Sequence, residues 1–363
     1  MTLKKRLGVL GRIAVGTCAV AIGVYGLYRY AMLKVEEADA ETARIRAAKQ
    51  NLTLRFNQNL KDSRAVVAKL APVVASQLTP YCNVEEFTAE LQQLRLDKKA
   101  AADPASKQRK AELWESLKIA AFTRAISALY LINLLNILTL VQLSVLAKFS
   151  YICSVSSRPI FLSSDTERMF LTLTWYLLHK GIFECTRRVK EAVEFVFTDT
   201  SVSTDVSCDE FLARIISIRI SVEGSGADRS TYLDFSTFLL PPTGEEKSAL
   251  KEALNADAAA TSAIEEDETL SHILNQTREF LERDTSFDKF EIHVRQSLFS
   301  AVPTTASEKI EDVTDVLEKR VKLASSLPTI SKFSSLVFAK EDNIILEVSF
   351  NTEYLIPEVL NKL

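Results

Sequence analysis

The side chains best suited to catalysis or metal binding are few in this chain, and they form no recognisable site. The five cysteines are scattered without a CxxC pair, so we expect ordinary buried thiols in a reducing compartment. His179 lies in an apolar helical pattern, where a core histidine is more common than a metal ligand. No GxSxG, P-loop or HExxH motif occurs. We therefore expect no catalytic residue, no cofactor and no metal. The lack of a motif favours a binding protein over an enzyme.

Binding through an aromatic anchor is suggested by the stretch ELWESLKIAAFTR at residues 112–124. On a helix, one face of this stretch carries Trp114, Leu117, Lys118 and Ala121. A second face leads into the apolar run that follows and carries Ile119, Phe122 and Ile126. An exposed tryptophan beside a leucine and a lysine is typical of a hot spot for a partner helix. The alternative, that Trp114 packs under a neighbouring loop, stays open.

The composition indicates what kind of scaffold must position this stretch. Apolar residues make up 47% of the chain and charged residues 25%, as in a globular protein with a good core. The net charge of -3 supplies no basic field, so we set nucleic-acid binding aside. Five of the nine glycines lie in the first 26 residues, which leaves few for the turns of a sheet. We expect an all-α body built from long helices.

The longest predicted helix follows Trp114 directly, because no glycine or proline occurs between Pro104 and Pro159. Its residues 125–147 are uncharged and long enough to span a membrane. Three amide side chains lie in the middle of this run, and each is costly in hydrocarbon without a partner: Asn133, Asn136 and Gln142. A helix that is apolar nearly all round can also be the central rod of a soluble bundle. We favour the central rod over a second membrane span.

The N-terminus predicts a membrane anchor. Residues 4–6 are Lys-Lys-Arg, and residues 7–27 are apolar apart from Arg12, which is long enough to cross the bilayer. A cleaved secretory signal is the alternative, and the flanking basic residues do not decide the orientation. We therefore expect an anchor at 1–34, an exposed helical linker at 35–62 and an α-helical bundle at 63–363.

Further helices are predicted from apolar periodicity and caps. We expect helices at 63–77 and 84–96, a polar loop at 97–110, and a helix at 165–198 opened by a capping box of Ser164 and Glu167. A second capping box, Ser207 with Glu210, should open a helix that stops at Gly224. After a loop at 225–243, the remaining helices are expected at 244–256, 262–283, 287–300 and 306–325. The tail at 329–362 should be helical, although NIILEVSF within it is also compatible with a strand.

The stretch from residue 112 to 152 resembles the peroxin-3 family, that of peroxisomal biogenesis factor 3. The matching residues are Trp114-Glu115, Leu117-Lys118-Ile119, Phe122-Thr123-Arg124 and Val141-Gln142-Leu143. A second similar stretch is LNQTREFLERDTSF at 274–287, and a third is Leu327-Pro328 followed by Lys332. The basic N-terminus and the single anchor also fit this family.

The resemblance implies a fold, a location and a partner. Family members are membrane proteins of the peroxisome, or of a specialised peroxisome such as a glycosome. A single N-terminal transmembrane anchor holds them, and their bulk is a cytosolic α-helical bundle around one very long helix. They dock the soluble import receptor peroxin-19 through its amphipathic helix, so that membrane proteins can be inserted. The resemblance implies a partner-binding groove formed by Trp114, Leu117 and Lys118, with further wall residues at Lys110, Leu91, Leu94 and Lys332. Two alternative functions are a membrane tether or scaffold and, less favoured, a membrane-anchored enzyme.

Overall fold

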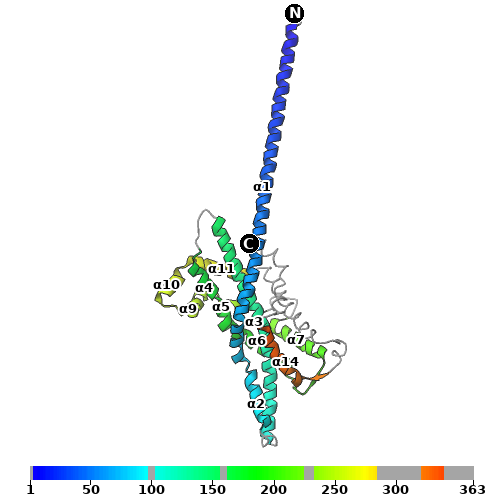
Figure 1. Cartoon of the computed structure of the whole chain (residues 1–363), viewed down its shortest axis with the longest axis vertical. Coiled ribbons are helices and arrows are strands. Elements are labelled where there is room, and N and C mark those ends of the chain that lie inside the picture. The colour runs from blue at the N-terminus through cyan, green and yellow to red at the C-terminus, as the bar shows by residue number, and fades with distance from the viewer. Residues whose placement is uncertain (1–2, 97–102, 156–161, 225–232, 284–319, 339–363) are drawn as a thin grey trace. The chain divides into compact units, whose positions relative to one another are not determined.

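The computed structural model describes residues 3–96, 103–155, 162–224, 233–283 and 320–338 (Figure 1). The chain divides into two compact units, Met1–Phe56 and Asn57–Leu363, and each is described by itself. The first unit is the leading part of helix α1, which spans Leu3–Leu78. No break occurs at the expected helix start near Ser63, because no glycine follows Gly26 in this helix and Pro72 is its only proline. The predicted anchor, linker and first bundle helix are therefore one continuous helix.

The described part of the second unit is built from helices joined by turns and loops, with one short ribbon (Figure 1). Its elements after α1 are η1 (Thr79–Tyr81), α2 (Val84–Leu96), α3 (Pro104–Val155), α4 (Ser164–Thr172), α5 (Thr174–Tyr176), the π-helical turn η3 (Leu177–Gly181), α6 (Ile182–Phe197), α7 (Cys208–Glu223), α8 (Ser236–Leu239), α9 (Glu246–Leu254), α10 (Ala258–Glu266), α11 (Glu268–Arg283) and α14 (Leu323–Val337). The ribbon pairs β1 (Asp205–Val206) with β2 (Val321–Lys322) in antiparallel fashion. The predicted all-α class is confirmed.

Helix α3 forms the core of this unit. Among the described residues, one helix is long and apolar enough to cross a membrane, Pro104–Phe149, and 94% of its most apolar window is buried inside the protein. Helices α2, α6, α11 and α14 all pack against it (Figure 1). Since a helix that is apolar on every side needs a cover of other apolar surfaces, this packing confirms the predicted central rod.

The amides inside α3 have the partners that burial requires. The Gln142 side chain donates to the carbonyl oxygen of Phe170 at 2.9 Å and accepts from the Thr174 hydroxyl at 2.9 Å. Asn136 accepts from the Ser63 hydroxyl at 3.2 Å, and the third amide in the rod, Asn133, donates to a carbonyl of its own helix. A buried amide without such bonds would destabilise the fold, so these contacts make an enclosed rod physically consistent.

The predicted helix at 165–198 is interrupted, and its cap lies one residue earlier than expected. Ser163, rather than Ser164, accepts the backbone N–H of Thr166. The π-helical turn η3 then separates α5 from α6 at Gly181. At this point the chain passes so close to α8 that a Cβ atom on Gly181 would lie 2.2 Å from the carbonyl oxygen of Phe238. The interruption thus lies where α8 approaches the helix, a tertiary contact that the local pattern does not reveal.

Other predicted helix ends are confirmed or corrected by individual caps. The Ser207–Glu210 capping box is present, and Gly224 ends α7 with a φ of 87°. The expected helix at 262–283 divides at Asp267, whose carboxylate accepts the backbone N–H of Leu270 at 2.8 Å. The helix predicted at 306–325 is wrong at Val321–Lys322, which form β2, whereas residues 323–325 are helical and belong to α14. The predicted helix at 287–300 and the segment NIILEVSF lie outside the described residues.

Two of the five cysteines can be placed by their environment. Cys82 and Cys185 are buried free thiols, in line with the sequence expectation. Burial raises the pKa of each thiol to about 12, because the thiolate would lose its hydration. Both are therefore protonated at neutral pH and act as small apolar core residues.

Replacing Gly181 by alanine is expected to destabilise the bundle by about 1–3 kcal/mol, because the new methyl group would collide with the Phe238 carbonyl. Urea unfolding followed by circular dichroism measures this loss. Ser217→Ala, at an exposed position of α7, is the control and should stay within about 0.5 kcal/mol of the wild type. Equal stability of Gly181→Ala and the wild type would show that η3 and α8 are not in close contact.

Candidate partner-binding surface at the start of the long helix

Trp114 lies early in α3, at the border between core and solvent. Its side chain is half-buried, while its neighbours Leu113 and Leu117 are 1% and 6% exposed. The helix is therefore fixed from beneath by two buried leucines, and part of the indole stays accessible. An aromatic residue in this position can contribute a large apolar contact area at a small cost in conformational entropy.

The other residues implied by the family resemblance lie on α2, α3 and α14. They do not form a single exposed patch. Lys110 is exposed one turn before Trp114, and Lys332 is exposed on α14, which packs against α3. On α2, Leu94 is half-buried and Leu91 is buried. Leu91, like Leu117, is therefore part of the packing beneath the surface in the unbound protein. Whether any of these residues touches a partner stays a prediction.

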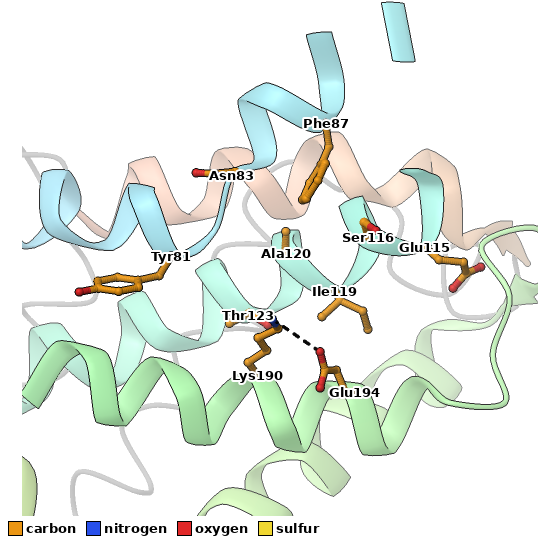
Figure 2. A pocket seen from close by; sticks show the side chains of 10 residues that line it. All are labelled: Tyr81, Asn83, Phe87, Glu115, Ser116, Ile119, Ala120, Thr123, Lys190 and Glu194. Carbon is orange, nitrogen blue, oxygen red and sulfur yellow. Dashed lines mark ion pairs between the residues drawn. The ribbon is translucent and has the colours of Figure 1, made fainter. Parts of the chain in front are cut away.

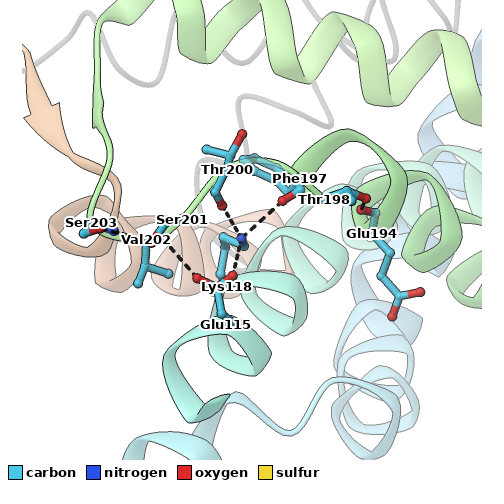
Figure 3. Close-up of polar contacts among 9 residues, drawn as sticks. All are labelled: Glu115, Lys118, Glu194, Phe197, Thr198, Thr200, Ser201, Val202 and Ser203. Atoms are coloured by element: carbon cyan, nitrogen blue, oxygen red, sulfur yellow. Dashed lines mark hydrogen bonds and ion pairs between the residues drawn. The ribbon is translucent and has the colours of Figure 1, made fainter. Parts of the chain in front are cut away.

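Lys118 has a different environment from the one that the helical face suggested. Its side chain is buried, and its ammonium group donates to the Glu115 carboxylate and to the carbonyl oxygens of Phe197 and Thr200 (Figure 3). An ammonium group has three donors, so all of them are used inside the protein. Phe197 is the last residue of α6 and Thr200 lies in the turn just after it, so both carbonyls are at the C-terminal end of this helix, where the helix dipole favours a cation. This arrangement favours a structural role for Lys118 over direct contact with a partner.

Glu115 extends the same network towards α14. Its second carboxylate oxygen accepts the backbone N–H of Val202 at 3.2 Å (Figure 3). Val202 and Thr204 in turn accept the backbone N–H groups of Ala324 and Leu323, at 2.9 and 3.0 Å, where α14 begins. We call Glu115 and Lys118, together with their partners Phe197, Thr200 and Val202, the Glu115–Lys118 clamp. The clamp joins α3, the end of α6 and the start of α14, which are far apart in the sequence.

Ion pairs join α2 to α3 on either side of Trp114. Arg109 donates to both carboxylate oxygens of Glu90, at 2.8 and 3.1 Å. Arg124, about four helical turns after Arg109, pairs with Glu85. Burial alone would raise the pKa of Glu85, but the hydrogen bond and charge of Arg124 outweigh it and lower that pKa. Sequence reasoning missed these ion pairs, because their partners lie on different helices and only the packing of α2 against α3 decides which side chains come close.

A cleft of about 360 Å³ opens on another side of α3, between α2 and α6 (Figure 2). Phe87, Ile119 and Thr123 are among the residues that line it. The sequence predicted that Ile119 leads into the rod together with Phe122 and Ile126. Phe122 and Ile126 are buried, but Ile119 is half-buried and faces this cleft. The core therefore extends less far around α3 at this level than the apolar pattern suggested.

The described residues hold no group of three or more histidine, cysteine or acidic side chains that could bind a metal ion. His179, expected in the core, is exposed. Its ring stacks on Trp175 with centroids 4.6 Å apart, and its Nδ1 lies 3.0 Å from the Trp175 carbonyl oxygen. Its predicted burial assumed a regular α-helix with 3.6 residues per turn. The residue lies instead in the wider π-helical turn η3, where that period does not hold.

Replacing Lys118 by methionine is expected to lower the free energy of unfolding by about 1–3 kcal/mol, because two buried carbonyls and the Glu115 carboxylate lose their donor. The matched control is Lys110→Met, an exposed position two turns earlier on the same helix, which should change stability by less than about 0.5 kcal/mol. Urea denaturation measures both. Equal stability of the two variants would mean that the clamp does not hold α3 to α6.

Comparisons with known proteins give the chain a family. The Peroxin-3 family model matches residues 11–107, 98–160 and 156–355. Peroxisomal biogenesis factor 3 of Yarrowia lipolytica is 25% identical over 340 residues, covering 77% of this chain and 78% of the relative. The proteins of the same name from Mus musculus and Homo sapiens are each 26% identical over 268 residues, covering 72% of this chain and 66% of the relative. The family predicted from residues 112–152 is thereby confirmed: this chain belongs to the peroxin-3 family.

Proposed function

We propose that this chain acts in peroxisome biogenesis as a membrane docking receptor. In this role it binds the amphipathic helix of a soluble import receptor of the peroxin-19 type and so enables membrane proteins to be inserted. Its curated relatives carry the name peroxisomal biogenesis factor 3, which points to biogenesis and not to an enzyme. The finer role rests on the surface around Trp114.

The half-buried position of Trp114 is the observation that carries the proposal. An amphipathic helix binds most tightly to a rigid surface that offers an aromatic anchor and apolar neighbours. Helix α3 is rigid at this point because Leu113 and Leu117 pack beneath it and the Glu115–Lys118 clamp fixes the adjoining elements. A surface held in advance loses little conformational entropy when a partner binds.

Charged and buried residues would contribute in different ways. Lys110, exposed beside Trp114, and Lys332, exposed on α14, can pair with acidic residues of a partner helix and fix its register. Leu94 is half-buried and can add apolar contact at the edge. Leu91, Leu117 and Lys118 act from below, by holding the helices that carry the surface.

The membrane attachment in this proposal uses the N-terminal segment. Residues 7–27 are apolar apart from Arg12 and lie within the continuous helix α1. The other apolar segment, in α3, already has its surface covered by protein and its amides bonded to protein groups. A single N-terminal anchor, with the bundle in the cytosol at the peroxisomal membrane, is therefore the simplest arrangement.

Trp114→Ala is expected to weaken binding of the receptor's amphipathic helix by about 30- to 1000-fold, since loss of such an anchor costs about 2–4 kcal/mol. The bundle should stay folded, with a melting temperature close to that of the wild type. Isothermal titration calorimetry measures affinity, and circular dichroism measures melting.

The matched control is Trp175→Ala, which removes the second tryptophan. That residue is also half-buried, but it lies on α5 against His179 and Lys180. Binding should be unchanged in this variant. An equal loss of affinity in both variants, or early melting of Trp114→Ala with affinity retained, would contradict the proposed surface.

A further inference from the structure

Helix α1 carries a heptad repeat over residues 35–56, within the first unit (Figure 1). Residues spaced alternately three and four apart share one face of an α-helix, at the places called a and d of each heptad. Counted from Val35, these places hold Val35, Ala38, Thr42, Ile45, Lys49, Leu52 and Phe56. Between residues 34 and 53, every apolar residue larger than alanine lies at one of them. We call this side of α1 the heptad face.

The heptad face has no cover within its own unit. The described residues of the first unit form a single helix, and Val35 on this face is 55% exposed. In the second unit the same places of the repeat do pack on a helix, because Asn59 donates to the Leu143 carbonyl of α3 and Ser63 donates to Asn136. Most of the stability of a helix comes from packing its apolar side, so the uncovered heptad face favours a second helix as its partner.

The charges beside the heptad face match a second copy of the same helix running in parallel. In a parallel pair, place g of one heptad faces place e of the next heptad on the other helix. Lys34 then faces Asp39 of the second copy, and Glu41 faces Arg46 of the second copy, with all four side chains exposed. Lys34 also pairs with Glu37 of its own helix at 3.1 Å, and its ammonium has further donors. Both contacts between the copies therefore join opposite charges.

The same charges select one register. A shift of one copy by a whole heptad would keep the apolar places in contact. It would, however, bring Lys34 to Arg46 and Asp39 to Glu41, which are like charges in both cases. Repulsion in the wrong register is a common way to specify the pairing of helices. The pattern thus favours two copies with equal residues side by side.

The residues of the heptad face are suited to two strands. β-Branched residues at place a, here Val35 and Thr42, favour two-stranded parallel coiled coils. A single lysine at place a, here Lys49, specifies register and oligomeric state at a cost in stability. Alanine at place d, as at Ala38, lets the helices approach but buries little apolar area. This composition favours a weak dimer in a defined register.

We propose that residues 34–56 of α1 form a parallel, in-register, two-stranded coiled coil with a second copy of this chain. The heptad face is the apolar seam, and the flanking charges set direction and register. Two chains held in one membrane by the proposed N-terminal anchor would run in the same direction, which agrees with the parallel arrangement. The coiled coil does not involve the proposed docking surface at Trp114.

Disulfide cross-linking of the full-length chain in mild detergent tests the seam. Ala38 lies at place d, whereas Ala40 lies at place f on the opposite side of the helix, and both are exposed. After oxidation with copper phenanthroline, Ala38→Cys is expected to yield about tenfold more linked dimer than Ala40→Cys, because only the seam brings equal positions within disulfide range. Non-reducing electrophoresis measures the yield, and the wild type gives the background of the native cysteines.

Charge reversal tests the register. Glu41→Arg and Arg46→Glu should each weaken dimerisation about tenfold, because two contacts between opposite charges become contacts between like charges. Sedimentation equilibrium in density-matched detergent measures the dissociation constant. The double variant Glu41→Arg/Arg46→Glu should restore the dimer, which a change in helix stability alone would not do.

Trp114→Ala should dimerise like the wild type, so failure of the docking surface and failure of the coiled coil can be told apart. The proposal is overturned if the wild type sediments as a monomer or if Ala40→Cys cross-links as strongly as Ala38→Cys. It is equally overturned if the double charge reversal leaves the dimer as weak as the single variants.

Discussion

The fold depends on enclosing a helix that is apolar on almost every side. Over residues 125–147 helix α3 is uncharged and has no polar face to turn towards water, so its stability requires other helices around it. Each fully buried leucine or isoleucine contributes about 1.5–3 kcal/mol relative to an exposed one, which makes this rod the main source of packing energy in the bundle. Apolar packing alone does not define how neighbouring helices are positioned along the rod. The buried amides Gln142 and Asn136 do so, because they form hydrogen bonds with specific groups on α4, α5 and α1.

The character of α3 changes towards its first turns. Around residues 109–118, ion pairs and hydrogen bonds replace uniform apolar packing: Arg109 pairs with Glu90, and the Glu115–Lys118 clamp reaches the end of α6 and the start of α14. These contacts have directions, so they hold neighbouring elements in a defined geometry where the apolar cover is thinner. Trp114 lies in this region as a large side chain that is supported from beneath but not enclosed. One helix thus combines a central core with an accessible surface at its start.

Sequence reasoning predicted those features that depend on local chemistry. The length of α3 follows from the absence of glycine and proline, and the ends of α7 follow from the Ser207–Glu210 box and Gly224. Features that depend on distant contacts were missed. Lys118 shares a helix face with Trp114, yet its burial is set by carbonyls of Phe197 and Thr200, which only the fold brings near. The interruption at η3, beside the exposed His179, lies likewise where α8 approaches Gly181, a contact that the local pattern does not reveal.

The central claim is that the indole at position 114 lies at the contact with the receptor helix, and photo-crosslinking tests it most directly. A photoreactive phenylalanine analogue such as p-benzoylphenylalanine replaces Trp114 or, separately, Trp175 in the full-length chain, and adducts with the peroxin-19-type receptor are mapped by mass spectrometry. The account predicts an adduct from position 114 within the receptor's amphipathic helix and none from position 175. Equal labelling from both positions, or adducts from position 114 that map only outside that helix, would contradict it.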